Sequence, residues 1–250
     1  MKPLSWKEVS NEESYEDHVN SVLELWRGKF KNTHLPSLSR ILTLDGEYVN
    51  NLVEVSIILH DTGKLFLGYQ EALRGKKEAI SRGEYRHEIV SAALTFFIVS
   101  ADELYLTSGA ILLHHEPILM GQVGRYAERY LTITDIERRL RKTCGDTIEF
   151  DSEGIDWTCK KLQNYPFNKY IPEEIKVDDA LEKIKELMLI LCVKCSPQRR
   201  ASLRLKVSSL GTLLSILDSV AANKNRKLLD GGGTFITKRA EKAEVSLAWL

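Results

Sequence analysis

Residues 51–64 read NLVEVSIILHDTGK, an apolar segment that runs directly into a histidine–aspartate pair, His60 and Asp61. The apolar side chains recur at helical spacing, which predicts a helix from Glu47 to His60. Neighbouring residues on a helix point about 100° apart, so the two side chains can serve one site only where the helix ends. Gly63 stands where a left-handed C-terminal cap would end it. The stretch therefore predicts a polar site at the end of a buried helix.

Helical periodicity recurs along most of the chain, so we expect an all-α fold. Further helices are predicted at Ser14–Phe30 with Ser14 as N-cap, Glu84–Ser100, Ser108–Glu116, Leu119–Lys142, Val177–Cys195 and Ala201–Asn223. Residues 143–174 are interrupted by glycines and prolines and are predicted to be an irregular insertion with one short helix. Residues 224–250 form a tail whose glycines allow a small C-terminal β-hairpin. We expect a single domain over residues 1–250 with its core at about 10–223.

The 250 residues are 43% hydrophobic and 28% charged, which is typical of a globular protein with a buried core. Thirty-five basic residues balance 35 acidic ones, which argues against a protein that coats duplex DNA by net charge. Contact with nucleic acid would depend on local basic clusters, although such clusters are more often solvated helix faces. The candidate residues are Arg138, Arg139, Arg199, Arg200 and Arg204.

The sequence shows no export signal, and its longest apolar run, Leu187–Val193, is far shorter than the ~20 residues that a membrane span needs. We therefore expect a cytoplasmic protein with no membrane association. Its four cysteines are too few for a disulfide scaffold and are expected to be reduced. Cys192 and Cys195 form a C-x-x-C pair, but their apolar neighbours favour buried inert thiols over a zinc site.

Five of the six histidines belong to one candidate site, and the sixth, His34, lies in a segment expected to be a polar loop. A second adjacent pair, at 114–115, precedes Pro117, which again marks the end of a helix. Asp218 is the only acid between Pro197 and Lys227 and lies on a strongly apolar helix, which favours a buried, paired carboxylate. Imidazole with carboxylate and no cysteine is a ligand set of hydrolytic Zn, Mn, Fe, Co or Ni sites. The candidate ligands are His18, His60, Asp61, His87, His114, His115 and Asp218.

The candidate ligands occur along the chain in the order H, HD, H, HH and D, and Lys64 follows the HD pair in the sequence HDTGK. This arrangement resembles the metal-dependent HD phosphohydrolase superfamily. Within it, the pattern is most similar to the HD nuclease domain of the CRISPR type I interference nuclease-helicase. The resemblance implies an HD-domain helical bundle with two divalent ions, which would be Mn, Fe, Co, Ni or Mg. It implies one ion on His18, His60, Asp61 and Asp218, and the other on Asp61, His87, His114 and His115.

In this resemblance Asp61 bridges the ions and Lys64 binds the scissile phosphate as a point charge. The alternative for Lys64 is a cation that interacts with the dipole of the preceding helix, worth about 0.3–1 kcal/mol. The resemblance implies a nuclease that cleaves single-stranded or locally opened nucleic acid, with single-stranded DNA favoured over RNA. Such a nuclease would be the DNA-degrading subunit of type I CRISPR interference and would work with the surveillance complex.

The chain contains no G-x-x-x-x-G-K-[ST] motif, so we expect the helicase to be a separate polypeptide. Two alternatives remain open at this point. One is an HD-family nucleotide or cyclic-nucleotide phosphohydrolase, which would hydrolyse mononucleotides faster than oligonucleotides. The other is a catalytically silent HD module that binds nucleic acid or a partner.

Overall fold

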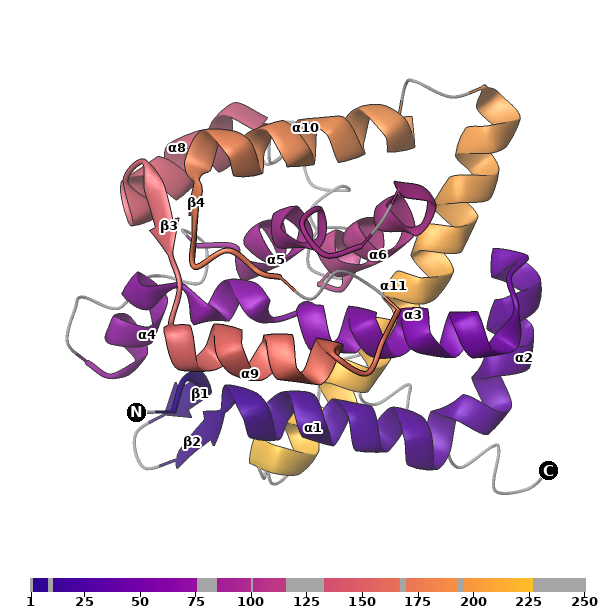
Figure 1. The fold of residues 1–250 in the computed structure, drawn as a ribbon, viewed down its shortest axis with the longest axis horizontal. Helices are drawn as coiled ribbons and strands as arrows, with labels where there is room; N and C mark the ends of the chain where they lie inside the picture. Colours follow the sequence, from indigo (N-terminus) through magenta and orange to yellow (C-terminus); the bar gives the residue numbers. More distant parts are fainter. Residues whose placement is uncertain are drawn as a thin grey trace, which may run out of the picture.

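Helices dominate the structure, a computed structural model, and pack around a continuous cluster of buried apolar side chains (Figure 1). The structure describes residues 2–8, 11–75, 85–99, 101–115, 133–166, 170–192 and 196–226. The expected all-α class is confirmed, with two small two-stranded antiparallel sheets added at the edges. The tail beyond residue 226, with its expected hairpin, and Cys195 lie outside the described residues.

The N-terminal part is a short hairpin followed by a long bent helix. Strand β1 (Leu4–Glu8) pairs with β2 (Asn11–Ser14), a hairpin that the sequence did not predict. Helix α1 (Tyr15–Leu25) begins as expected at Ser14, whose Oγ accepts a hydrogen bond from the Asp17 backbone N–H at 3.1 Å. A π-helical turn (Trp26–Phe30) connects α1 to α2 (Lys31–Leu42).

Helix α2 corrects the expectation that His34 lies in a polar loop, because His34 is within this helix. The segment buries only Leu38 and Leu42 and contains Pro36, so its apolar spacing is too sparse to signal a helix. Its placement against α3 is a tertiary contact that no local pattern carries.

The central helix α3 (Gly46–Leu59) begins at Asp45, whose carboxylate accepts the backbone N–H groups of Glu47 and Tyr48. It ends one residue before His60 and is followed by a 3₁₀ helix (Thr62–Leu65) and by α4 (Leu67–Leu73).

The expectation that Gly63 forms a left-handed cap is wrong, because the described glycines with positive φ are Gly75 and Gly145. A Cβ on Gly63 would lie 2.2 Å from the carbonyl oxygen of His87. The glycine therefore allows the 3₁₀ helix to pack directly against the start of α5.

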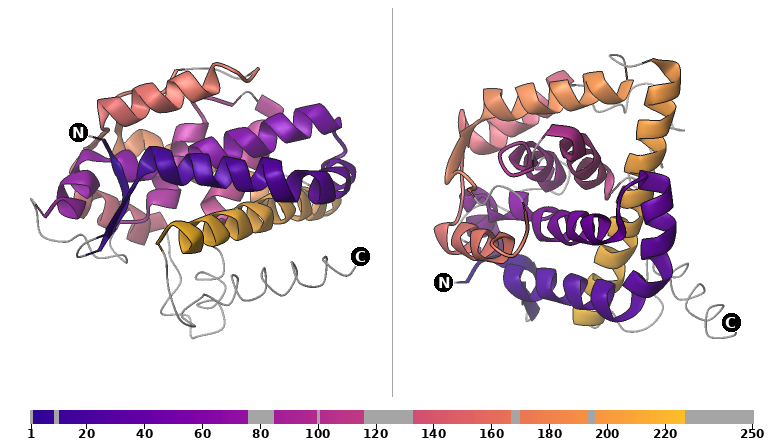
Figure 2. Two further views of the ribbon diagram at one scale, coloured as in Figure 1. Left: turned by 90° about the horizontal axis from the view of Figure 1, so that it is seen from below. Right: turned by 45° about the vertical axis from the view of Figure 1, so that its right-hand side comes forward.

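Helices α5 (His87–Thr95) and α6 (Ala101–Leu113) pack against each other in the middle of the molecule. Helix α6 starts seven residues before the predicted Ser108. The long α11 (Pro197–Arg226) crosses the molecule and contacts α6, α1, α2 and α3 (Figure 2). Gly109 of α6 and Gly211 of α11 lie at the α6–α11 crossing, against Val207 and Ala110 respectively.

Among the described residues, α11 is the one helix long and apolar enough, by length and composition, to cross a membrane. Core helices of soluble proteins pass the same test. Here the apolar side chains Val207, Leu210, Leu214 and Leu217 are buried, so their hydrophobicity is explained by packing within the fold.

The remaining elements lie around the central helices. They are α8 (Ile133–Cys144), β3 (Thr147–Glu149), α9 (Ser152–Leu162), β4 (Glu174–Lys176) and α10 (Val177–Cys192). In the view of Figure 1, α10 lies along the upper edge and α9 lies beside α1 and α3. The short helix expected in the insertion is α9, whereas the β3–β4 pair was not predicted because three-residue strands carry too little alternation to detect. Of the helix predicted at 119–142, only the part from Ile133 onward is described.

Candidate metal centre

The His60–Asp61 pair lies at the end of α3, where the chain changes from α-helix to a 3₁₀ helix. His60 still has helical dihedral angles, but Asp61 has φ −108° and ψ 6°, so the regular 100° rotation between neighbours is broken here. Both residues are buried, with 0% and 1% of their surface exposed. The helix end therefore lets both side chains face one interior site, as the sequence predicted.

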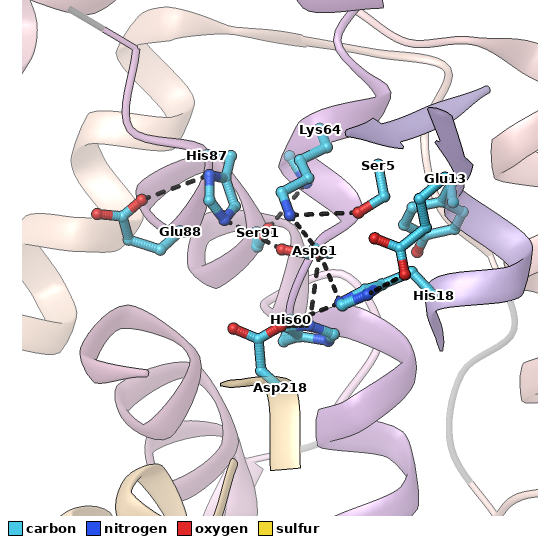
Figure 3. Close-up of polar contacts among 12 residues, drawn as sticks. Ser5, Glu13, His18, His60, Asp61, Lys64, His87, Glu88, Ser91 and Asp218 are labelled. Carbon is cyan, nitrogen blue, oxygen red and sulfur yellow. Dashed lines mark hydrogen bonds and ion pairs between the residues drawn. The ribbon is translucent and has the colours of Figure 1, made fainter. Parts of the chain in front are cut away.

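One group of candidate ligands comes from three separate helices. His18 on α1, His60 and Asp61 at the end of α3, and Asp218 on α11 offer donor atoms that all lie within 4.8 Å of one another (Figure 3). Oδ1 of Asp218 is 3.0 Å from Nε2 of His18 and 3.8 Å from Nε2 of His60. We call these four residues the first ligand group. They are the four residues that the resemblance assigned to one ion.

A second ligand group is formed by His87, His114 and His115, whose donor atoms also lie within 4.8 Å of one another. His87 is the first residue of α5, and the histidine pair follows directly after the end of α6 at Leu113. Nε2 of His115 lies 3.2 Å from Nε2 of His87. The structure thus brings together all seven residues that the sequence singled out as ligands.

Asp61 contacts both groups through different oxygen atoms. Its Oδ2 is 3.4 Å from Nε2 of His18 and 3.5 Å from Nε2 of His60. Its Oδ1 is 3.0 Å from Nε2 of His87. This is the position that a carboxylate shared between two cations would occupy.

The imidazoles of His60 and His114 are oriented by their own helices. Nδ1 of His60 is 2.6 Å from the carbonyl oxygen of Ile57, and Nδ1 of His114 is 2.6 Å from that of Ile111. A ring that donates its Nδ1–H to a carbonyl presents the lone pair of Nε2 to the opposite side. In both residues that side is the interior of the site.

Several candidate ligand atoms in the centre are buried and, within the described part of the chain, have no hydrogen-bond partner. They are Nε2 of His18, His60 and His114, and Oδ1 of Asp61. Burying such atoms without a partner is costly, and convergent imidazole and carboxylate donors match the preferences of divalent transition metals. The residues present therefore fit a metal centre.

The electrostatics keep the carboxylates charged. Burial acts to raise the pKa of Asp61, but the charges of Lys64 and His60 overcome it and hold this pKa well below the usual range. Burial is likewise overcome at Asp218, where the nearby imidazoles of His18 and His60 hold the pKa well below normal. Ionised carboxylates are the form that binds cations.

The histidines of the centre are affected in opposite directions. Burial and the nearby charges of His60 and His87 lower the pKa of His114 to about 4. Burial also lowers the pKa of His115. At His18 burial is outweighed by the carboxylates of Asp218 and Glu13, which raise its pKa to about 9. His114 and His115 are therefore neutral near pH 7, which is the metal-binding form of imidazole.

Lys64 lies within the site but makes a contact that the sequence did not anticipate. Its Nζ is 2.6 Å from Oδ2 of Asp61 and 3.4 Å from Oγ of Ser5, and the residue is only 8% exposed (Figure 3). The ion pair explains how a lysine is accommodated in a buried position. Its expected roles, phosphate binding or interaction with the helix dipole, both stay predictions.

Three residues near the centre were missed by sequence reasoning: Ser5, Glu13 and Asn225. Glu13 contacts His18, and Asn225 contacts Glu13. Ser5 and Glu13 come from the unpredicted N-terminal hairpin, and Asn225 lies near the end of α11. No local spacing pattern links these positions to the histidines, so the tertiary structure was needed to find them.

The arginines proposed for nucleic-acid contact are not gathered at the centre. Arg138 and Arg139 lie on α8, and Arg138 pairs with Asp135. Arg199 and Arg200 lie in the first turn of α11, about 28 Å along the helix from Asp218 at 1.5 Å per residue. Arg204 donates its Nε–H to the carbonyl oxygen of Leu191 at 2.9 Å, next to the end of α10.

The chain matches no family model, but it has clear relatives among characterised proteins. It is 30% identical over 197 residues to the CRISPR-associated endonuclease Cas3-HD of Methanocaldococcus jannaschii, an alignment that covers 75% of this chain and 76% of that relative. The chain belongs to the Cas3-HD family. This membership confirms the resemblance to a CRISPR-associated HD nuclease domain that the order of histidines and aspartates indicated.

Other comparisons agree. The Cas3-HD endonuclease of Pyrococcus furiosus is 34% identical over 139 residues, covering 52% of this chain and 57% of that protein. That of Thermoproteus tenax is 23% identical over 250 residues, covering 94% of each. The solved structure of the CRISPR-associated Cas3 HD domain protein from M. jannaschii superposes with a TM-score of 0.61 at 27% identity, covering 81% of this chain and 95% of that one. The HD helical bundle is therefore the fold of this Cas3-HD chain.

Proposed function

We propose that this chain is a two-metal HD nuclease that hydrolyses phosphodiester bonds in single-stranded or locally opened nucleic acid. The observation that carries the proposal is the position of Asp61, whose two oxygens face different groups of histidines. A carboxylate shared in this way could keep two cations close enough together to act on one phosphodiester bond. The names of the related endonucleases support the same reaction class.

The residues divide into roles according to their groups. The first ligand group would hold one divalent ion and the second, with Asp61 shared, the other; the candidates are Mn, Fe, Co, Ni and Mg. Such ions supply Lewis-acid activation of a water nucleophile and neutralise charge on the phosphodiester. Lys64 would move from its pair with Asp61 to bind the scissile phosphate as a point charge.

The names of the relatives, which are CRISPR-associated, support a proposal for the biological setting. We place the chain in type I CRISPR interference as a cytoplasmic single-domain subunit that degrades DNA. Its partners would be a separate helicase polypeptide and the surveillance complex. Single-stranded DNA is the expected substrate, and RNA is the alternative that the assay below distinguishes.

The test is a cleavage assay with the full chain on end-labelled single-stranded DNA, duplex DNA, bubble DNA and single-stranded RNA. Each substrate is incubated with Mg²⁺, Mn²⁺, Co²⁺, Ni²⁺ or Zn²⁺, and with EDTA as the metal-free control. We expect metal-dependent cleavage that is fastest on single-stranded DNA and absent in the Asp61→Ala variant. Faster hydrolysis of mononucleotides would overturn the proposal in favour of a nucleotide phosphohydrolase. Tight binding with no cleavage in any metal would overturn it in favour of a silent module.

A further inference from the structure

Glu13 is a buried carboxylate on β2 that contacts the far side of the His18 ring. Its Oε1 lies 3.1 Å from Nδ1 of His18, and the residue is 6% exposed (Figure 3). The Nε2 of the same ring faces Asp61 and Asp218 in the first ligand group. The His18 ring therefore lies between a carboxylate outside the centre, at Nδ1, and the predicted metal position, at Nε2.

His18 differs in this respect from the other oriented histidines. The Nδ1 atoms of His60 and His114 meet backbone carbonyl groups, whereas Nδ1 of His18 meets a charged side chain. Nδ1 of His87 is 3.8 Å from the carboxylate of Glu88, which is too long for a hydrogen bond. A carboxylate partner fixes the ring tautomer and makes the imidazole a more basic ligand than a carbonyl partner does.

Glu13 is in turn held by α11. Nδ2 of Asn225 donates to the same Oε1 of Glu13 at 2.6 Å and also contacts Oγ of Ser21 on α1 at 3.0 Å. Asn225 follows Asp218 by seven residues, so both side chains lie on one face of α11 about two turns apart. Helix α11 thus affects both nitrogens of His18. Its Asp218 lies next to Nε2, and its Asn225 contacts Glu13, which in turn contacts Nδ1.

We propose that Glu13 is a positioning residue of the first ligand group, held in place by Asn225. It orients His18 so that Nδ1–H points to β2 and the Nε2 lone pair points into the centre, and it strengthens Nε2 as a metal ligand. The inference rests on the proposed function, because it concerns the affinity of the same metal centre. It gives the N-terminal hairpin, which carries no predicted ligand, a direct part in metal binding.

The test is a calorimetric titration of the full-length, metal-free protein with Mn²⁺. The variants are Glu13→Ala, Glu13→Gln, Asn225→Ala and the matched control Glu12→Ala, an exposed neighbour on the same strand. We expect Glu13→Ala to weaken binding in the first ligand group roughly 10–100-fold. Glu13→Gln keeps an acceptor oxygen and loses less affinity, Asn225→Ala loses an intermediate amount, and Glu12→Ala matches the wild type.

Two backgrounds assign the effect to one ligand group. In His114→Ala protein the second group is disabled, and Glu13→Ala should still weaken the remaining binding event. In Asp218→Ala protein the first group is disabled, and adding Glu13→Ala should change the Mn²⁺ affinity of the remaining binding event less than about threefold. Circular dichroism checks the fold, and the conservative Glu13→Gln variant keeps the test decisive where Glu13→Ala does not fold.

Unchanged Mn²⁺ affinity in Glu13→Ala, an equal loss in Glu12→Ala, or an equal loss in both backgrounds would each overturn the proposal for Glu13. A wild-type chain whose Mn²⁺ affinity depends on Glu13 as described, but which cleaves no nucleic acid, would overturn the proposed nuclease function alone. A wild-type chain that binds none of Mn²⁺, Co²⁺, Ni²⁺ and Mg²⁺ would overturn both.

Discussion

His18 and Asp218 stand 200 positions apart in the sequence, yet Nε2 of His18 lies 3.0 Å from Oδ1 of Asp218. The contact exists because α11 crosses the molecule and packs against α1. The candidate metal centre is therefore completed by a helix near the C-terminal end of the described chain. The candidate ligand His18, near the N-terminus, therefore depends on the packing of α11, near the other end of the described chain.

The role of Asp218 is best tested by a point substitution. Removing everything after Arg204 would also remove the buried apolar side chains of α11, so loss of folding would hide the effect of the carboxylate. Asp218→Asn keeps the shape but loses the charge. We expect it to lower Mn²⁺ affinity by more than the roughly 10–100-fold that loss of a supporting hydrogen bond costs, and to abolish cleavage. Ser208→Ala, exposed on the same helix, is the control, and unchanged metal affinity in Asp218→Asn would make Asp218 structural.

Asp61 is the residue whose loss should affect both ligand groups. Asp61→Ala removes the contacts with His18, His60 and His87 at once, so we expect near-complete loss of cleavage and of both bound ions. Metal content by mass spectrometry and turnover on labelled DNA measure the two effects, and circular dichroism confirms that the helices remain. Retention of two ions, or of near wild-type turnover, would contradict a shared carboxylate.

Lys64 has two predicted roles that kinetics can separate. If it binds the scissile phosphate mainly in the transition state, Lys64→Ala should lower the turnover number roughly 10- to 1000-fold. If its role is only structural, as the partner of the helix dipole and of buried Asp61, the variant should lose stability, by up to roughly 3–5 kcal/mol for a broken buried ion pair, and keep its turnover. Lys64→Arg keeps the charge but changes the reach and donor geometry. Turnover and thermal midpoint of both variants decide between the roles.

The sequence was informative about the ligands because five of the seven carry a local signal. Two of them form the pair His60–Asp61 at a helix end, two more form the pair His114–His115, and Asp218 is an isolated acid on an apolar helix. Glu13 carries no such signal. Its contact with Asn225 joins residues 212 positions apart, and only the packing of α11 against the N-terminal hairpin creates it.

The fold was predictable to the extent that helices bury a regular apolar face. Helix α3 is apolar enough to be buried on all sides from Leu52 to Leu59, and its prediction is confirmed within one residue at each end. The hairpin β1–β2 was missed because tertiary contacts hold it. The side-chain amide of Gln70 pairs with the backbone N–H and carbonyl of Leu4 at 2.7 and 2.8 Å, which acts like an additional strand neighbour.

Gly63 offers a test of how closely the 3₁₀ helix is packed against the start of α5. A Cβ at this position would meet the carbonyl oxygen of His87 at 2.2 Å, against backbone that cannot rotate away. We expect Gly63→Ala to destabilise the protein by roughly 1–3 kcal/mol or more, the size of other overpacking effects, and to displace His87 from the second ligand group. Gly28→Ala is the control, because no atom lies within 4 Å of a Cβ there, and it should be neutral or stabilising by up to about 1 kcal/mol. Equal thermal midpoints for the two variants would show that α5 moves freely relative to the 3₁₀ helix.

Away from the centre, Glu54 on α3 provides a prediction about pH. Its carboxylate accepts hydrogen bonds from Nε of Arg27 at 3.0 Å and from the hydroxyl of Tyr165 at 2.5 Å. Burial acts to raise the pKa of Glu54, but these hydrogen bonds and the charge of Arg27 lower it below 4.5. A folded-state pKa below the unfolded value means that the contribution to stability is present above pH 4.5 and is lost as the pH falls through the folded-state pKa.

Glu54→Gln should therefore unfold at a lower temperature than the wild type at pH 7. The gap should narrow as the pH is lowered below 4.5, because the wild-type carboxylate then takes up a proton and loses its charge-assisted hydrogen bonds. Thermal midpoints by circular dichroism from pH 3 to pH 8 measure the gap, in metal-free buffer so that the histidine centre contributes equally to both proteins. Glu24→Gln, exposed on α1, controls for the loss of a surface charge. A gap of constant size across this range would mean that the shape of the Glu54 side chain, and not its charge, stabilises the contact with Arg27 and Tyr165.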